Sequence, residues 1–210
     1  MNVMCKKSFP CTGVILSGGN NSRFSGKNKA FVKMGAQSIL GRIYSALNGL
    51  FEEIILVSND SVSYIDWNLT LVPDLYPFRS SLTGLHAGLF FATTPFVFVT
   101  ACDTPFVKKE LIKTILDSIE SGFDAIVPET DTGIEPLFAV YSKKSIGAVN
   151  MQIARQKFKI RSLFKYLNTK YVPEDILREK DSDLLSFINI NTPDELKAAA
   201  ILEKSSGLFL

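Results

Sequence analysis

Residues 12–33, TGVILSGGNNSRFSGKNKAFVK, decide the fold of this chain. The apolar run at residues 14–16 predicts a buried strand that passes directly into a loop of small and polar residues. This loop begins with Ser17, Gly18 and Gly19, and its cationic side chains are Arg23, Lys27 and Lys29. A glycine-bearing loop after a strand leaves backbone N–H groups free to point at an anion. The stretch therefore predicts a polyphosphate site at the carboxyl end of a parallel strand.

Two common phosphate-binding loops do not match this stretch. A P-loop needs four residues between its first glycine and Gly-Lys, followed by Ser or Thr, whereas Gly26-Lys27 is followed by Asn28. The dinucleotide fingerprint GxGxxG is also absent, which disfavours an NAD-dependent dehydrogenase. A flexible surface loop is the remaining alternative on the glycine pair alone. The ordered set of strand, glycines, arginine and lysine favours the phosphate site.

Length and composition limit the class of protein. The chain has 210 residues, 46% of them hydrophobic, which predicts a single domain over residues 1–210 with residues 1–10 as a loose lead-in. A net charge of +2 indicates no broad basic surface for nucleic acid. The apolar runs are far shorter than the ~20 residues that span a bilayer, and the first residues lack the apolar core of a signal peptide. We expect no partner of either kind, nucleic acid or membrane.

The cysteines and the single histidine bear on location and chemistry. Cys5, Cys11 and Cys102 form no CxxC pair and are odd in number, which together with the absent export signal predicts a reducing, cytoplasmic location. Cys102, beside an aspartate, could be a nucleophile, but no base for a thiol is evident and a small buried cysteine is the favoured interpretation. His86 lies in an apolar context, and a packed or partly exposed helix residue is favoured over a ligand.

Strands and helices alternate along the chain. Predicted strands occupy residues 14–16, 54–57, 69–72, 96–100, 124–128 and 135–141. Helix-period patterns follow at residues 39–50, capped by Ser38, and at residues 82–91, 111–119 and up to about 154. A capping box with proline at the first helical position, at residues 192–195, opens a last helix. Such alternation predicts an α/β protein with helices on a mostly parallel sheet.

Polar side chains follow several of the predicted strands. Besides the first loop, they are Ser58, Asn59, Asp74 and Asp103. In parallel sheets ligands bind in a crevice beyond the carboxyl ends of the strands. We therefore expect the phosphate loop and two carboxylates to share one edge of the sheet. Asp103, which follows a strand and precedes Thr104-Pro105, is a suitable Mg²⁺ ligand.

With these residues in view, the chain resembles the molybdenum cofactor guanylyltransferases, which belong to the nucleotidyltransferases that use NTPs. The resemblance covers most of residues 12–200 and rests on four further motifs, CDTP, LVPDLYP, PLFAVYSK and FININTPDEL. In the first loop the matching residues are Leu16, Gly18, Gly19, Ser22, Arg23 and Lys29. Three places depart from the family pattern: Ser25 intervenes after Phe24, Asn28 stands where an aspartate is frequent, and Ser80-Ser81 replace Gly-Pro.

The resemblance implies a Rossmann-like nucleotidyltransferase fold with three α/β/α layers, and it implies roles for named residues. Implied catalytic residues are Lys29, Arg23 and Asp103. Implied nucleotide-binding residues are Leu16, Ser17, Gly18, Gly19, Lys29, Asp74 and Asp103. Asp103 and Asn191 are the implied Mg²⁺ ligands, and Asn189 and Pro136 lie on the implied acceptor side. The implied reaction joins GMP from GTP to the phosphate of molybdenum-molybdopterin, releasing pyrophosphate.

Several points stay open on the sequence. A CTP-dependent enzyme acting on the same pterin is the nearest alternative, then a sugar-phosphate nucleotidylyltransferase, and a non-catalytic nucleotide-binding module is the alternative of another class. The basic stretch at residues 157–165 is either a solvated helix face or a contact for the acceptor. We expect a monomer that makes transient contact with proteins delivering or receiving the cofactor.

Overall fold

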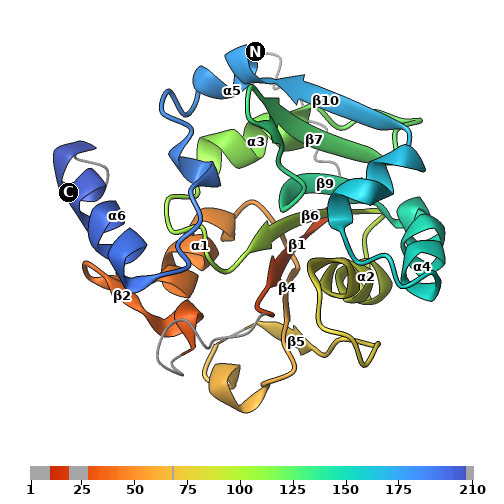
Figure 1. Cartoon of the computed structure of the whole chain (residues 1–210), viewed down its shortest axis with the longest axis horizontal. Helices are drawn as coiled ribbons and strands as arrows, with labels where there is room; N and C mark the ends of the chain where they lie inside the picture. The colour runs from red at the N-terminus through yellow and green to blue at the C-terminus, as the bar shows by residue number, and fades with distance from the viewer. Residues whose placement is uncertain (1–9, 19–27, 68, 207–210) are drawn as a thin grey trace, which may run out of the picture.

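A computed structural model of the chain describes residues 10–18, 28–67 and 69–206. Its centre is a mixed sheet in the order β10-β7-β9-β6-β1-β4-β5, with β8 paired to β7 (Figure 1). The first half supplies β1 (Cys11–Leu16), β4 (Ile54–Val57), β5 (Thr70–Val72) and β6 (Phe96–Ala101). The second half supplies β7 (Ala125–Thr130), β8 (Gly133–Ile134), β9 (Phe138–Ser142) and β10 (Thr169–Pro173). A small hairpin, β2 (Lys33–Met34) with β3 (Gln37–Ser38), stands apart.

The sheet is mostly parallel, as predicted. β1 pairs in parallel with β4 and β6, β4 with β5, and β10 with β7. β9 runs antiparallel to both β6 and β7, and β8 is antiparallel to β7. The carboxyl ends of β1, β4, β5 and β6 consequently meet at one edge.

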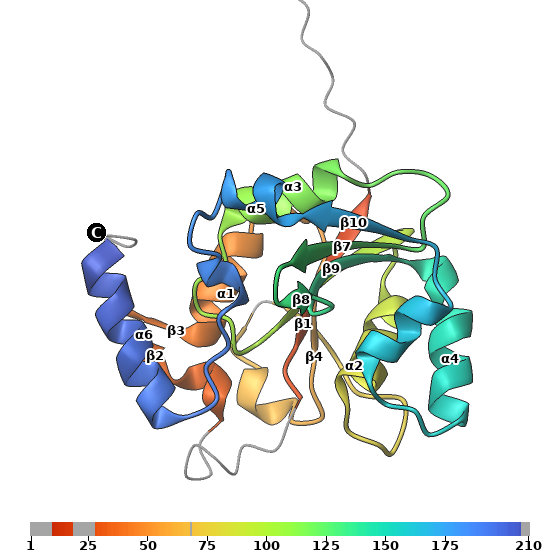
Figure 2. The ribbon, with the colours of Figure 1, turned by 45° about the horizontal axis from the view of Figure 1, so that its top comes forward.

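Helices cover both faces of this sheet and complete the three layers (Figures 1 and 2). The α-helices are α1 (Ile39–Leu47), α2 (Ser81–Phe91), α3 (Lys109–Asp117), α4 (Ile146–Ala154), α5 (Glu174–Arg178) and α6 (Pro193–Ser206). Short 3₁₀ helices are η2 (Lys29–Phe31), η3 (Val62–Tyr64), η4 (Lys143–Ser145), η5 (Ile160–Lys165) and η6 (Leu185–Phe187). Within the described part of the chain no helix combines the length and apolarity needed to cross a bilayer.

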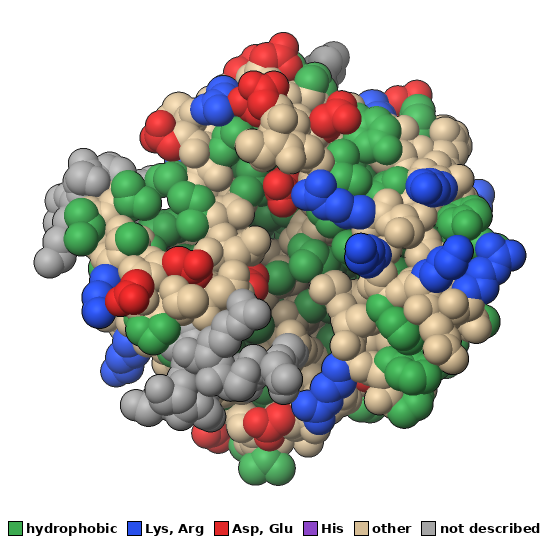
Figure 3. Space-filling view, in the orientation of Figure 1, with side chains coloured by type: hydrophobic (Ala, Val, Ile, Leu, Met, Phe, Trp, Pro, Cys, Tyr) green, Lys and Arg blue, Asp and Glu red, His purple; other side chains and the backbone are tan. Residues whose placement is uncertain are grey.

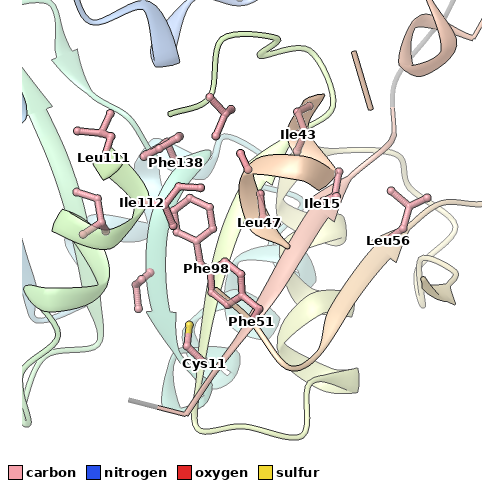
Figure 4. Packing of buried hydrophobic residues seen from close by; sticks show 14 of the residues in the cluster. Cys11, Ile15, Ile43, Leu47, Phe51, Leu56, Phe98, Leu111, Ile112 and Phe138 are labelled. Carbon is pink, nitrogen blue, oxygen red and sulfur yellow. The ribbon is translucent and has the colours of Figure 1, made fainter. Parts of the chain in front are cut away.

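Alternate residues of β1 pack in two separate hydrophobic cores, one on each face of the sheet. Ile15 joins the cluster under α1 and α3, which includes Phe98 and Phe138 (Figure 4). Val14 and Leu16 point to the other face and pack in the cluster under α2 and α4. A strand buried on both faces reads as a continuous apolar run, which is what residues 14–16 show.

Small residues let α2 pack closely on β1. A Cβ added at Gly88 would lie 2.7 Å from Val14 Cγ1, and one at Gly84 would lie 3.2 Å from a methyl carbon of Leu16. The helix therefore sits against the strand that leads into the phosphate loop. Its first turn begins at the predicted phosphate-binding edge.

Most predicted elements are present with shifted ends. The helix predicted to Leu50 ends at Leu47, and the strand predicted from residue 135 begins at Phe138. Residues 135–137 instead form a turn, in which the Phe138 N–H donates to the Glu135 carbonyl at 3.1 Å. The predicted N-cap at Ser38 and the capping box at Thr192 are both formed. Residues 1–9 of the predicted lead-in lie outside the described part.

Candidate active site

A cavity of about 560 Å³ opens at the carboxyl ends of the parallel strands. After β1 it is lined by Leu16, Ser17 and Gly18; after β4 by Ser58, Asn59 and Asp60; after β5 by Asp74; and after β6 by Cys102 and Asp103. Lys29 and Asn191 reach it from η2 and from the segment before α6. Figure 3 shows this face of the molecule hollowed near its middle, with acidic and basic side chains around the hollow. The edge predicted from the strand ends is thus a real cavity.

Lys29, Asp103 and Asn191 meet inside this cavity. Lys29 Nζ donates to Asp103 Oδ2 at 3.1 Å and to Asn191 Oδ1 at 2.9 Å. The lysine side chain is 14% exposed and the aspartate side chain 23%, so the pair is only partly screened by water. Three residues from distant parts of the chain therefore converge on one ammonium group. The strand ends predicted that Lys29 and Asp103 share this edge, and the family resemblance implied that Asn191 reaches it.

The residues present fit a bound Mg²⁺. Asp103 Oδ1 is buried and accepts no hydrogen bond from the described residues. Asn191 Oδ1 is a second oxygen donor within reach of the same lysine. No group of three or more acidic, Cys or His side chains that could hold a metal exists in the described part of the chain. Mg²⁺ commonly uses one or two carboxylates and completes its shell with substrate phosphate and water, so this sparse donor set suits it.

The start of the phosphate loop is fixed by β1 and its neighbours. The Ser17 N–H donates to the Val57 carbonyl at 2.9 Å, and the Leu16 carbonyl accepts from the Cys102 N–H at 3.0 Å. A Cβ at Gly18 would meet nothing within 4 Å, so the backbone there borders open space. Gly19 and Arg23, both predicted site residues, lie outside the described residues.

Tyr64 joins both ends of this loop, and the sequence did not predict it. Its hydroxyl forms a short hydrogen bond with Ser17 Oγ and accepts one from Asn28 Nδ2 at 2.7 Å. The Asn28 Oδ1 atom accepts from the Ala30 N–H at 3.1 Å and so caps η2, the helix that begins with Lys29. Burial raises the pKa of the Tyr64 phenol, which keeps it protonated near neutral pH. From the sequence, Tyr64 is one aromatic residue in a short polar segment, a pattern that predicts core packing but not hydrogen bonds from its hydroxyl.

Asp74, which follows β5, also lines this cavity. Its N–H donates to Asn59 Oδ1 at 2.9 Å, and Asn59 Nδ2 donates back to Asp74 Oδ2 at 3.1 Å. Burial raises the pKa of this carboxyl, and the Asn59 hydrogen bond and the nearby Arg79 charge offset only part of the effect. Arg79 and Ser80 also line the cavity. Ser80, at one of the departures from the family pattern, caps α2 through a capping box with Thr83.

The predicted acceptor-side residues line a second cavity. Pro136 and Asn189 border a space of about 190 Å³, and Leu137 lines both cavities. Arg161, from the basic stretch at residues 157–165, also lines it, together with Glu135. Arg161 belongs to the basic stretch for which the sequence left a contact with the acceptor open, whereas the sequence did not single out Glu135. Their proximity depends on a turn and a 3₁₀ helix that its apolar pattern does not define.

The surroundings of Cys102 do not favour a reactive thiolate, and His86 is packed in a helix. Cys102 borders the cavity and is half-buried rather than fully buried, and burial raises the pKa of its thiol to about 11. His86 is buried in α2, where its ring packs edge-on against Tyr76 at 4.9 Å between centroids. Burial lowers the pKa of His86. These surroundings supply no thiolate at neutral pH, in line with the interpretation favoured from the sequence.

Known proteins resemble the chain over nearly its whole length. It is 40% identical to a molybdenum cofactor guanylyltransferase of Desulfosudis oleivorans, with 94% of this chain and 98% of that protein covered. A probable molybdenum cofactor guanylyltransferase of Pelotomaculum thermopropionicum is 34% identical, with 93% and 94% covered.

A solved structure and a family model agree with this likeness. The crystal structure of molybdopterin-guanine dinucleotide biosynthesis protein A from Archaeoglobus fulgidus superposes with a TM-score of 0.80 at 29% identity, covering 92% of this chain and 99% of that one. The model of the MobA-like NTP transferase domain matches residues 13–171. The chain therefore belongs to the MobA-like NTP transferase family, whose members are nucleotidyltransferase enzymes.

Proposed function

We propose that this enzyme transfers GMP from GTP to the phosphate of molybdenum-molybdopterin and releases pyrophosphate. The observation that carries the proposal is the contact of Lys29 with both Asp103 and Asn191 inside the large cavity. An ammonium group beside a carboxylate with one free oxygen suits a metal-bound polyphosphate. The guanylyltransferase names of relatives up to 40% identical support guanine as the base.

In the proposed reaction an oxygen of the acceptor phosphate attacks the α-phosphorus of GTP. The bond from that phosphorus to the bridging oxygen breaks, and pyrophosphate leaves on the opposite side. A phosphate monoester has its second pKa near ~6, so it is already largely dianionic and needs no strong general base. Catalysis then consists mainly of positioning and charge neutralisation.

The residues of the cavity divide this work. Lys29 neutralises charge that develops on the leaving pyrophosphate, and the backbone at Ser17 and Gly18 borders the phosphates. Gly19 and Arg23 are assigned to the same task on the sequence alone. Asp74, oriented by Asn59, binds the nucleoside part of GTP. Leu16 forms an apolar part of the cavity wall.

Asp103 and Asn191 would hold Mg²⁺. The metal supplies charge neutralisation at the phosphates when bound. Asp103 Oδ1 is free to take this part because it has no hydrogen-bond donor among the described residues. Lys29 keeps the other carboxylate oxygen and the Asn191 amide in fixed positions.

The acceptor is assigned to the second cavity. Asn189 and Pro136 border it, and Leu137 lines both cavities, so an acceptor held there reaches the α-phosphate from the side of β9. Arg161 adds one positive charge to that wall. A cytoplasmic location, a monomeric state and transient contacts with cofactor-handling proteins are proposed on the sequence and the family.

Two measurements test the proposal. Isothermal titration with GTP, CTP and UTP in the presence of Mg²⁺ should show tightest binding of GTP, and a preference for CTP would contradict the guanine assignment. Pyrophosphate release should require GTP and molybdopterin together. Nucleotide binding without pyrophosphate release would indicate a non-catalytic module, and release with a sugar phosphate as acceptor would indicate a different transferase.

A further inference from the structure

The second cavity has a composition suited to a small flat ring. Its walls are mainly apolar, and the charged side chains among its lining are Glu135 and Arg161. The apolar lining residues are Pro136, Leu137, Phe138, Ile160 and Phe187. Its volume of about 190 Å³ is below that of a typical cavity for a drug-sized ligand, which is ~300 Å³ or more. A single bicyclic ring, rather than a whole nucleotide, is the scale of ligand that it accommodates.

Two hydrogen bonds hold the backbone of Glu135 just before β9. Its N–H donates to the Pro128 carbonyl at 3.0 Å, and its carbonyl accepts from the Phe138 N–H at 3.1 Å. The carboxylate itself forms no hydrogen bond or ion pair within the described part of the chain, although its residue is half-buried. The Glu135 oxygens are not among the water-inaccessible unpartnered atoms, so solvent supplies their donors in the free protein and a ligand with N–H groups can replace it. Its surroundings therefore point to a ligand with N–H groups.

Arg161 is fixed beside this carboxylate without neutralising it by contact. One guanidinium nitrogen donates to the Ile134 carbonyl at 2.9 Å. The close approach depends on Gly133, where φ is +125° and an added Cβ would lie 2.8 Å from the guanidinium. Burial raises the pKa of Glu135, and the charge of Arg161 opposes that rise. The guanidinium thus favours the ionised carboxylate while leaving its oxygens available.

A 2-amino-4-oxopyrimidine edge matches these features. It presents two parallel N–H donors, one from the ring and one from the amino group, to the two oxygens of a carboxylate. The rest of a fused bicyclic ring is flat and largely apolar on its faces, as are the cavity walls. Both guanine and pterin carry this edge. The pterin is favoured here because the phosphate-handling residues Lys29 and Asp103 line the other cavity, which leaves this one for the acceptor.

We propose that Glu135 recognises the 2-amino-4-oxopyrimidine edge of the pterin in the acceptor and so determines acceptor specificity. This inference rests on the proposed function, because it takes the acceptor to be a pterin phosphate. Arg161 is the positioning residue that keeps the carboxylate charged. Asn189, on the same cavity, lies two residues from Asn191, which brings the acceptor side close to the reacting phosphates.

A pair of fluorescent probes tests this recognition directly. The first is 6-hydroxymethylpterin phosphate, and the second is its 2,4-dioxo (lumazine) counterpart, in which a carbonyl oxygen replaces the 2-amino group. Wild-type protein should bind the pterin about tenfold more tightly or better, as for other bidentate contacts to a heterocycle edge. Glu135→Gln should abolish or reverse that preference, because a carboxamide can donate to the 2-oxo group and accept from the ring N–H.

Glu129→Gln is the matched control, since Glu129 is exposed on β7, pairs through its backbone with Ile134 and lines neither cavity. It should leave the preference at the wild-type value. An unchanged preference in Glu135→Gln, a wild-type protein that binds both probes equally, or one that binds neither at millimolar concentration would overturn the inference.

Binding of GTP and ITP shows whether Glu135 contacts the 2-amino-4-oxopyrimidine edge of guanine or that of pterin. It also separates a failure of this inference from a failure of the proposed function. ITP lacks the 2-amino group, so the ratio of GTP to ITP affinity should be the same in wild-type protein and in Glu135→Gln. A ratio that depends on Glu135 would assign the carboxylate to guanine and overturn the pterin assignment. Absence of GTP binding in the wild-type protein would instead contradict the proposed function, whatever the pterin probes show.

Discussion

The Ile190 N–H donates to the carbonyl of Asp103 at 2.9 Å. This backbone bond joins the segment that carries Asn189 and Asn191 to the end of β6, although the two lie more than 80 residues apart in the chain. Because Asn191 is the next residue, its amide reaches the same lysine as the Asp103 carboxylate. The geometry of the site therefore depends on how firmly the segment before α6 is anchored.

An ion pair between Lys108 and the buried Asp181 helps to anchor the segment that leads to these residues. Lys108 Nζ lies 2.8 Å from an oxygen of the Asp181 carboxylate, which is fully buried and also accepts from the Ser186 N–H. Lys108→Met should lower the free energy of unfolding by about 3 kcal/mol, because it leaves a buried carboxylate without its cation. Urea denaturation measures this loss. Lys113→Met, which breaks the exposed pair with Glu110, should cost less than about 1 kcal/mol, and equal losses would contradict the prediction.

Lys29→Ala and Asp103→Ala should each reduce turnover by about 10²-fold or more. Each variant removes a preorganised charge that the proposed reaction uses at the phosphates, and such groups commonly contribute that much. Steady-state pyrophosphate release measures the effect, with circular dichroism to verify folding. Lys33→Ala, at the exposed residue of β2, is the matched lysine control and should retain wild-type turnover. A Lys29 or Asp103 variant with near-wild-type turnover would remove that residue from the catalytic assignment.

Tyr64→Phe should reduce kcat/KM for GTP by about tenfold. The substitution leaves the ring in place but removes the hydroxyl that connects Ser17 with Asn28, and unsatisfied polar groups of this kind typically cost about 1–3 kcal/mol. Since Asn28 caps the helix that begins with Lys29, the loss should come from a misplaced lysine.

Two comparisons distinguish this positioning role from a general loss of stability. Tyr44→Phe removes a hydroxyl that forms no hydrogen bond within the described part of the chain, from a ring that packs edge-on against Trp67. It should leave kcat/KM unchanged. In Tyr64→Phe the Mg²⁺ concentration needed for half-maximal rate should also rise, because a misplaced Lys29 no longer fixes Asp103 and Asn191, whereas in Tyr44→Phe it should stay at the wild-type value. An equal loss in both variants would contradict the positioning role.

The sequence predicts the sheet edge well because its strands are buried on both faces. Continuous apolar runs such as residues 54–57 and 96–100 identify strands without help from tertiary contacts, and the polar residue after each then falls at the same edge. Lys29 and Asp103 meet for that reason. The antiparallel direction of β9 follows from the turn at residues 131–132, after which both β8 and β9 run opposite to β7, and the apolar pattern does not reveal this turn.

Elements that depend on tertiary contacts could not be predicted in the same way. In β10 only Val172 is buried, so this edge strand lacks the apolar run of its neighbours. Tyr64 is fully buried, yet its hydroxyl matters because residues 17 and 28 come together around it, a contact that local pattern does not encode. The second cavity combines Glu135 with Arg161 from η5. Its existence depends on the packing of a turn against a 3₁₀ helix.

Cys102→Ala should keep turnover within about threefold of wild type. The thiol borders the cavity, but burial raises its pKa to about 11, so it is protonated throughout the neutral range and cannot act as a thiolate nucleophile. The pH–rate profile of the wild-type enzyme should accordingly show no thiol ionisation between about pH 6 and 9, and the profile of the variant should coincide with it. Loss of activity in Cys102→Ala with nucleotide binding intact would restore the nucleophile hypothesis.

Asp74→Asn should become more stable relative to wild type as the pH rises. The folded-state pKa of Asp74 lies above its ordinary value of 3.8 because of burial. Between that value and the raised pKa the folded state binds more protons than the unfolded state, so wild-type stability falls as the pH rises through this window. The asparagine variant lacks this contribution.

Glu53→Gln supplies a control of opposite sign. Burial alone would raise the pKa of Glu53, but hydrogen bonds from Thr12 and Thr93 outweigh it and hold the pKa below its ordinary value of 4.5. That carboxylate stabilises the fold above its unfolded pKa, and the benefit is lost as the pH falls. Denaturant unfolding from pH 4 to pH 7 should therefore show the difference from wild type moving in opposite directions for the two variants. If the two stability differences change in the same direction with pH, burial does not govern the ionisation of Asp74. Weaker GTP binding by Asp74→Asn would identify nucleotide recognition as the reason why a carboxylate stands at this position.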